Sequence, residues 1–310
     1  MSRRKSAKNR DAPRSVAQSF QEYGRGVAGG LMFSLPLLYT MEVWRAGFNS
    51  HPWRLAAYVA ATFALLLGYN RFAGLRHDVV MLEVAIDSVE EMGIGFILSA
   101  VALYLLGRIT TDMPLNEIAG QVVIEAMTVA IGVSVGTSQL GGGKDTGEGD
   151  TGGGDDEAGQ AKRGGRAGKA SGTRRGEPEL HFGGQMLLAL CGAALFAANV
   201  APTEEVVVIA IEISWLRLLG LAFVSLLVGA FILHYSEFGS AHRFVHTESF
   251  GEVIADSVAT YAVALVASGL MLWFFGRFDG VSLYTSLAQV IVLGVAATLG
   301  ASAGRLLLQG

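Results

Sequence analysis

Long runs of apolar residues alternate with short polar segments along most of the chain. A helix needs about 20 mainly apolar residues to cross the hydrocarbon core of a bilayer. By that measure the pattern predicts eight membrane-spanning helices, or seven if the first run does not span. The first run is the least regular, because it contains Pro36 and ends near Glu42. The expected spans lie near residues 26 to 44, 54 to 72, 80 to 107, 116 to 137, 184 to 201, 213 to 235, 252 to 275 and 284 to 306.

The pattern therefore predicts an all-α fold, a polytopic transmembrane bundle in two parts separated by a polar stretch. Residues 1–24 are mostly polar and basic, and we expect them to form a cytoplasmic tail. Residues 25–138 form the first membrane unit of four helices and residues 183–310 the second. Between them, residues 139–182 are rich in Gly and lack the apolar residues needed to fold, which predicts a disordered cytoplasmic linker.

The two membrane units match each other at an offset of 169 residues. The sequence E-V-x-x-D-S-V runs from Glu83 to Val89 and recurs from Glu252 to Val258. Shared hydrophobicity does not explain matched acids, so we interpret the chain as an internal duplication. A unit of four spans returns the chain to its starting side, which makes the halves parallel. The same offset pairs Ser99 with Ser268, Gly107 with Gly276, Arg108 with Arg277 and His77 with His246.

A second part of the match follows when the offset changes by one residue. It pairs Gln121 with Gln289, and Gly132-x-x-x-Gly136 with Gly300-x-x-x-Gly304. Such small-residue faces let helix backbones approach closely, so we expect helix packing there. Gly29-Gly30 and Gly183-Gly184 open the first and fifth spans at similar places.

Composition supports a membrane protein and argues against other classes. The chain is 51% hydrophobic and 16% charged, with a mean hydropathy of +0.44, and its excess apolar surface is expected to face lipid. The net charge of −4 is small, and the charges cluster outside the apolar runs without forming a field that could hold nucleic acid, so no nucleic-acid partner is expected. Cys191 is the one cysteine, so neither an internal disulfide nor a thiolate metal cluster is possible. The absence of an H-E-x-x-H motif and of a Ser and His pair within spans argues against an enzyme, and we expect no cofactor.

Lys and Arg near the helix ends predict the orientation, because cytoplasmic loops carry an excess of both. With eight spans, the N-terminal tail, the turn from Arg71 to Arg76, the basic linker and the loop at Arg243 all fall on one side. That side is expected to be the cytoplasm, with both termini inside.

Six carboxylates at the start of the third and seventh spans are the main candidates for an ion or proton site. Carboxylates in a bilayer cost about 2.5 to 3.5 kcal/mol each on insertion scales and usually face a bundle interior or a wet cavity. Spacing of four residues places members of each group on one helix face. For the two outermost acids, a favourable position at the helix N-terminus is an equally good explanation. The six are Glu83, Asp87, Glu90, Glu91, Glu252 and Asp256.

Four further polar residues are secondary candidates, namely Gln121, Gln289, His77 and His246. The glutamines are expected to bond between helices, or else to a solute. The histidines are expected at the solvated interface, and no metal site is expected. Glu125 aligns with Leu293, which excludes a symmetric role for that acid.

The E-V-x-x-D-S-V motif, followed by a long apolar stretch ending in Gly-Arg in a duplicated chain, resembles a bacterial family of integral membrane proteins of unknown function. The resemblance implies a bacterial inner-membrane location and supplies no catalytic residues. We expect a cation or proton transporter or channel in which Asp87 and Asp256 are paired and Glu90 and Glu91 tune them. The alternative is a scaffold or sensor that transports nothing. The sequence specifies no oligomeric state.

Overall fold

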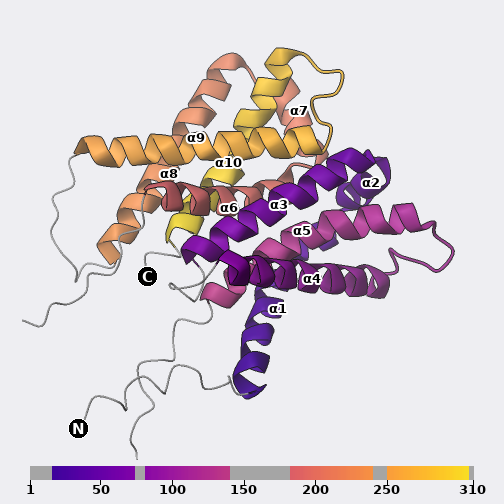
Figure 1. Cartoon of the computed structure of the whole chain (residues 1–310). Helices are drawn as coiled ribbons and strands as arrows, with labels where there is room; N and C mark the ends of the chain where they lie inside the picture. The colour runs from indigo at the N-terminus through magenta and orange to yellow at the C-terminus, as the bar shows by residue number, and fades with distance from the viewer. Residues whose placement is uncertain (1–15, 74–80, 140–181, 240–249, 307–310) are drawn as a thin grey trace, which may run out of the picture.

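The computed structural model describes residues 16–73, 81–139, 182–239 and 250–306, and the regular structure within these ranges is entirely helical (Figure 1). The expected all-α fold is thereby confirmed. The helices are α1 (Val16–Leu38), α2 (Met41–Asn49), α3 (Pro52–Ala73), α4 (Met81–Leu105), α5 (Leu115–Gln139), α6 (Phe182–Val200), α7 (Glu204–Glu212), α8 (Trp215–Gly239), α9 (Phe250–Phe274) and α10 (Leu283–Leu306).

Seven of the described helices are long and apolar enough to cross a membrane, namely α3, α4, α5, α6, α8, α9 and α10. Each agrees with an expected span to within a few residues at both ends. The expected first span, 26 to 44, differs from the structure, because α1 ends at Leu38 and α2 begins at Met41. Helix α1 is not among the seven, so the described residues agree with the smaller expected number of spans.

Two short helices, α2 and α7, were missed by the hydropathy pattern. Each follows a threonine with extended backbone, Thr40 (φ −98°, ψ 116°) and Thr203 (φ −76°, ψ 150°). Each also carries acid in its first turn, Glu42 in α2 and Glu204 with its neighbour in α7, where the helix dipole favours negative charge. Thr followed by acid was therefore a local signal for a helix start inside each apolar stretch.

Helix α5 is the centre of the first half and α10 the centre of the second. Helices α1, α2, α3 and α4 all pack on α5, while α6, α7, α8 and α9 all pack on α10. The two halves meet mainly where α3 packs on α6 and where α5 and α1 approach α6. Polar side chains on α4 therefore have neighbours from the first half, and those on α9 have neighbours from the second.

Glycines allow the closest helix contacts in each half. A Cβ added at Gly29 in α1 would lie 2.5 Å from Cα of Gly136 in α5. A Cβ added at Gly192 in α6 would lie 2.1 Å from the carbonyl oxygen of Gly300 in α10. The expected packing role of the small-residue faces is confirmed. Gly183, which the sequence match placed opposite Gly29, has nothing within 4 Å, so Gly192 makes the corresponding contact.

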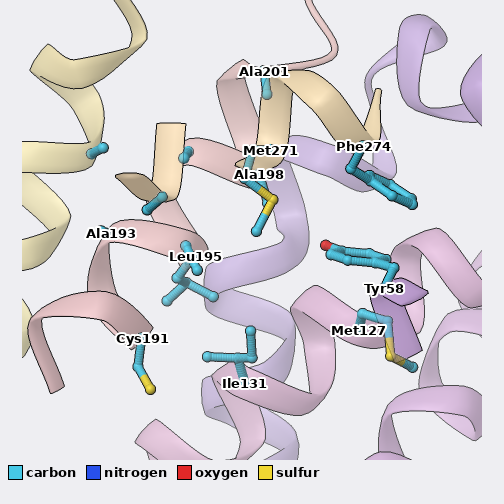
Figure 2. Close-up of a cluster of buried hydrophobic side chains, with 14 of the residues drawn as sticks. Tyr58, Met127, Ile131, Cys191, Ala193, Leu195, Ala198, Ala201, Met271 and Phe274 are labelled. Atoms are coloured by element: carbon cyan, nitrogen blue, oxygen red, sulfur yellow. The ribbon is translucent and has the colours of Figure 1, made fainter. Parts of the chain in front are cut away.

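A continuous apolar core joins the two halves (Figure 2). The ring of Tyr58 in α3 stacks on Phe274 at the end of α9, with ring centroids 4.2 Å apart. Met127 lies beside Tyr58, and Cys191 lies on the α6 side of the same core. The buried Cys191 thiol donates a long hydrogen bond to the carbonyl oxygen of Leu65, with sulfur and oxygen 3.8 Å apart. The core is therefore shared and leaves the polar clusters at its margins.

Several expectations fall wholly or partly outside the described residues. The expected tail, 1–24, is described only from Val16, where α1 begins, so its last part is helical. The interior of the expected linker, 139–182, lies outside the described residues. His77 and His246 also lie outside them, and Glu252 is described only as backbone within α9.

Candidate functional site

The first polar cluster consists of Asn70 in α3, Ser88 and Glu91 in α4, and Ser134 in α5. The Asn70 side-chain amide donates to Oε2 of Glu91 at 2.8 Å and to the hydroxyl of Ser88 at 3.1 Å. The Ser134 hydroxyl donates to Oδ1 of Asn70 at 2.8 Å. Asn70 therefore joins three helices, and its amide orients one oxygen of the Glu91 carboxylate.

Further polar contacts surround the first cluster. The Tyr69 and Ser138 hydroxyls lie 2.7 Å apart, and Tyr23 in α1 donates a hydrogen bond to Oε1 of Glu90. Glu83 and Glu90 are exposed at the surface of α4, while Asp87 and Glu91 are half-buried. The electrostatic neighbours of Glu91 include Asp87 and Glu90. Glu91 is thus linked through Asn70 to both α3 and α5.

The second polar cluster consists of Gln185 in α6, Asp256 and Thr260 in α9, and Arg305 in α10. One guanidinium nitrogen of Arg305 lies 2.7 Å from Oδ2 of Asp256 and 2.7 Å from the side-chain oxygen of Gln185. The other terminal nitrogen donates to the Thr260 hydroxyl at 2.7 Å. The Arg305 side chain is 3% exposed and that of Asp256 38% exposed. Buried charges need such partners, and this guanidinium has the Asp256 carboxylate and three neutral acceptors, the third being the backbone carbonyl of Asp256 at 3.5 Å.

The two clusters occupy corresponding ends of their helices. Each lies in the first half of α4 or α9 and near the last turns of α5 or α10. Ser88 and Ser257 both donate to the carbonyl four residues earlier, at 2.8 Å in each case. At about 1.5 Å per residue, Glu91 lies about 15 Å along α4 and Asp256 about 9 Å along α9. The helices therefore carry polar groups well beyond their first turns.

Asp87 and Asp256 have separate surroundings. Helix α4 packs on α1, α3 and α5, while α9 packs on α6, α8 and α10. The structure assigns Asp256 a buried arginine partner that the sequence analysis did not anticipate. Asn70 and Ser134 were missed as well, because an amide and a hydroxyl inside apolar runs carry no distinctive pattern. The available signal was that both residues lie near the ends of α3 and α5, at the side of the bundle where α4 begins with its acids.

The opposite end of the bundle carries matching turns after α4 and α9. Gly107 and Gly276 have φ of 66° and 70°, and the next amide in each case bonds back to the carbonyl five residues earlier, at 2.8 Å. This is the Schellman arrangement, which favours glycine. Arg108 lies over the Trp44 ring at 4.2 Å, while Arg277 donates to the carbonyls of Ala201 and Pro202.

Acids from the short helices α2 and α7 lie within electrostatic reach of Arg277, in the turn after α9. Burial lowers the pKa of Arg277, and the carboxylates of Glu204 and Glu42 act in the opposite direction. Gln289 is fully buried, and its amide donates to the carbonyl oxygen of Arg277 at 3.3 Å. Gln289 thus bonds from α10 to the turn that follows α9, and the expectation of a bond between helices stays a prediction.

Helix α5 carries a buried acid, Glu125, for which the alignment with Leu293 had excluded a symmetric role. Glu125 is 1% exposed, and neither of its carboxyl oxygens has a hydrogen-bond partner among the described residues. One turn earlier, Gln121 is 2% exposed, and its side-chain oxygen is also without a partner there. Thr128 on the same helix lies 3.4 Å from the Tyr58 hydroxyl, which is within electrostatic reach of Glu125.

These features define a multi-pass integral membrane protein with polar groups inside its helix bundle. Residues 22–308 match the family described as "Putative integral membrane protein (DUF2391)", and the chain belongs to that family. No curated protein and no solved structure shows significant similarity to the chain. Within the described ranges, no group of three His, Cys, Asp or Glu side chains is arranged to hold a metal ion.

Proposed function

We propose that this protein moves a proton or a small cation across the membrane, and that Glu91 in the first polar cluster is the central carboxylate. The observation that supports this most is the difference between the clusters. In the second cluster the Arg305 guanidinium lies against Asp256 at 2.7 Å and provides a permanent positive charge. In the first cluster the partners described for Glu91 are neutral, namely the Asn70 amide and the Ser134 hydroxyl.

The aligned positions support the same interpretation. At the offsets of the sequence match, Glu91 aligns with Thr260 and Thr137 aligns with Arg305. The first half therefore has an additional acid where the second has a hydroxyl, and a hydroxyl where the second has a guanidinium. A carboxylate inside a membrane bundle needs a compensating positive charge. A mobile cation or proton at Glu91 supplies that charge in the first half.

Flux measurements on Glu91→Gln test the proposal. In vesicles containing the purified protein, the wild type should dissipate an imposed proton or sodium gradient, and E91Q should slow this flux about tenfold or more. Glutamine keeps the size of the side chain and an oxygen for Asn70 while removing the charge. Glu212→Gln, an exposed acid at the end of α7, is the matched control and should leave flux unchanged.

Asp87→Asn and Asp256→Asn extend the same test. We expect D87N to reduce flux, because Asp87 acts electrostatically on Glu91. If E91Q, D87N and D256N all conduct like the wild type, the transport proposal is wrong. If the folded wild type conducts neither ion, the scaffold or sensor alternative is favoured.

One observation favours that alternative function. The Arg305 ion pair joins α9 to α10 and, through Gln185, to α6, as expected of a polar group that stabilises a bundle. A scaffold would use both clusters in this way and would present its loops to a partner. It predicts that substitutions in either cluster lower stability in parallel and that flux is absent throughout.

We also infer that the chain is a duplicated unit of four long helices and one short helix, with the halves running parallel. In both α1 to α5 and α6 to α10, one long helix is followed by a short helix and then by three long helices. The packing of α1 on α5 resembles that of α6 on α10, and glycines make the closest contacts in both. The paired turns at Gly107 and Gly276 support the same relation.

The orientation and location remain part of this proposal. Arg71 and Arg305 lie in the last turns of α3 and α10, at the end of the bundle that carries both polar clusters. We place this end in the cytoplasm of a bacterial inner membrane, with both termini there, which requires α1 to cross the membrane as an eighth helix. Cysteine substitutions in the tail and in the Arg243 loop should then react with membrane-impermeant reagents only from the cytoplasmic side.

A further inference from the structure

A carboxyl group without a partner lies near the middle of the most enclosed helix. Glu125 follows the start of α5 by ten residues, or about 15 Å, which is half the thickness of a hydrocarbon core of about 30 Å. Its side chain is 1% exposed and both carboxyl oxygens lack a hydrogen-bond partner in the described structure. Burying an uncompensated carboxylate costs far more than burying a neutral polar group, so Glu125 must hold either a proton or a cation.

The neighbouring polar atoms define the chemistry of that occupant. Gln121 precedes Glu125 by one turn and therefore lies on the same face of α5. Its side-chain oxygen is buried and also lacks a partner among the described groups. The Glu125 and Gln121 side chains thus present three oxygen acceptors for which the described residues supply no donor. Three acceptors with one negative charge suit a small monovalent cation, because hard cations bind oxygen ligands.

Packing alone does not require an acid at this position. The sequence match places Leu293 of α10 opposite Glu125, and Leu293 is fully buried. The same place in the second half is therefore filled by an apolar side chain of similar size. Gln289, the counterpart of Gln121, donates its amide to the carbonyl oxygen of Arg277, while its own side-chain oxygen also lacks a partner among the described residues. An unpartnered glutamine oxygen therefore occurs in both halves, and the acid at Glu125 beside it is the property of the first half.

We propose that Glu125 and Gln121 form a binding site for one sodium ion inside the first half of the bundle. Glu125 supplies the charge and two possible oxygen ligands, and Gln121 supplies a neutral oxygen. The Tyr58 hydroxyl of α3 lies 3.4 Å from that of Thr128 and is within electrostatic reach of Glu125. The site is separate from the Glu91 cluster and does not require the protein to transport an ion.

Equilibrium binding of radioactive sodium to the purified full-length protein in detergent tests the site. Choline chloride keeps the ionic strength constant. The wild type should bind sodium saturably at neutral pH, and Glu125→Gln should weaken this binding about tenfold or more, because the charge of the ligand set controls affinity. Glu117→Gln, on the first turn of the same helix, is the matched control and should bind like the wild type.

The outcomes distinguish a sodium site from a buried acid that holds only a proton. In the second case the wild type shows no saturable sodium binding, and that result overturns the proposal. Unchanged binding by folded E125Q also overturns it. If E125Q does not fold, Gln121→Leu decides, since weaker binding supports the site and unchanged binding refutes it. Glu91→Gln should retain sodium binding in detergent even where flux is lost, so the two proposals fail independently.

Discussion

Replacing Gly192 with alanine is expected to destabilise the protein severely, by about 3 kcal/mol or more, at the upper end of the range for overpacked sites. The added Cβ would lie 2.1 Å from the carbonyl oxygen of Gly300 and 3.1 Å from Cα of Gly304. These are backbone atoms of α10, so no side-chain rotation relieves the clash. Helices α6 and α10 would have to separate. Thermal unfolding of the purified variant in detergent measures the loss.

Gly183→Ala is the matched control for this substitution. It lies on the same helix, α6, and a Cβ there meets nothing within 4 Å. Alanine has the higher helix propensity, so G183A should be neutral or slightly stabilising. Gly29→Ala in α1 should behave like the Gly192 variant, since its Cβ would lie 2.5 Å from Cα of Gly136. Equal stabilities for G192A and G183A would contradict the close contact between α6 and α10.

Removing Asp256 should cost more than removing its partner Arg305. Asp256→Ala leaves a guanidinium that is 3% exposed without a counter-charge, which costs about 3 kcal/mol at the lower end of the range for broken buried pairs. Arg305→Met leaves a carboxylate that is 38% exposed and can be hydrated, so we expect a loss of only about 1 to 2 kcal/mol. Unfolding of both variants, measured under the same conditions, gives the difference.

The double variant D256A/R305M completes this prediction. Replacing both charges removes the unpaired group, so its stability should exceed that of D256A alone. The coupling energy from the double-mutant cycle then measures the pair. Glu212→Ala, an exposed acid on α7, should change stability by less than about 0.5 kcal/mol. If the two single variants lose equal stability, burial of Arg305 does not control the effect.

The sequence predicted the long helices well because a bilayer imposes a simple requirement on length and hydropathy. For α4, the expected span from 80 to 107 compares with Met81–Leu105 in the structure. The first span was the exception, since apolar residues continue across the break between Leu38 and Met41. Hydropathy averages over such a break, whereas the local signal at Thr40 and Glu42 lies in only a few residues.

The candidate site was only partly predictable, for a different physical reason. The acids on α4 and α9 are costly in a membrane, so their positions alone drew attention to them. The partners of those acids depend on how neighbouring helices are rotated, which no single-helix pattern specifies. Arg305 lies 49 residues after Asp256, and Asn70 lies 21 residues before Glu91. Gly192 was missed likewise, because the choice between it and Gly183 depends on which helix face meets α10.

Arg305 occurs in only one half of the bundle, and this asymmetry is possible because both halves belong to one polypeptide. In a symmetric dimer of a single unit, every side chain occurs twice, so an arginine introduced at one cluster would fill both. Here the residue that aligns with Arg305 is Thr137, and the residue that aligns with Glu125 is Leu293. Covalent linkage frees each half to change its own charge. Under the proposed function, one half anchors the bundle while the acids of the other half exchange their partners.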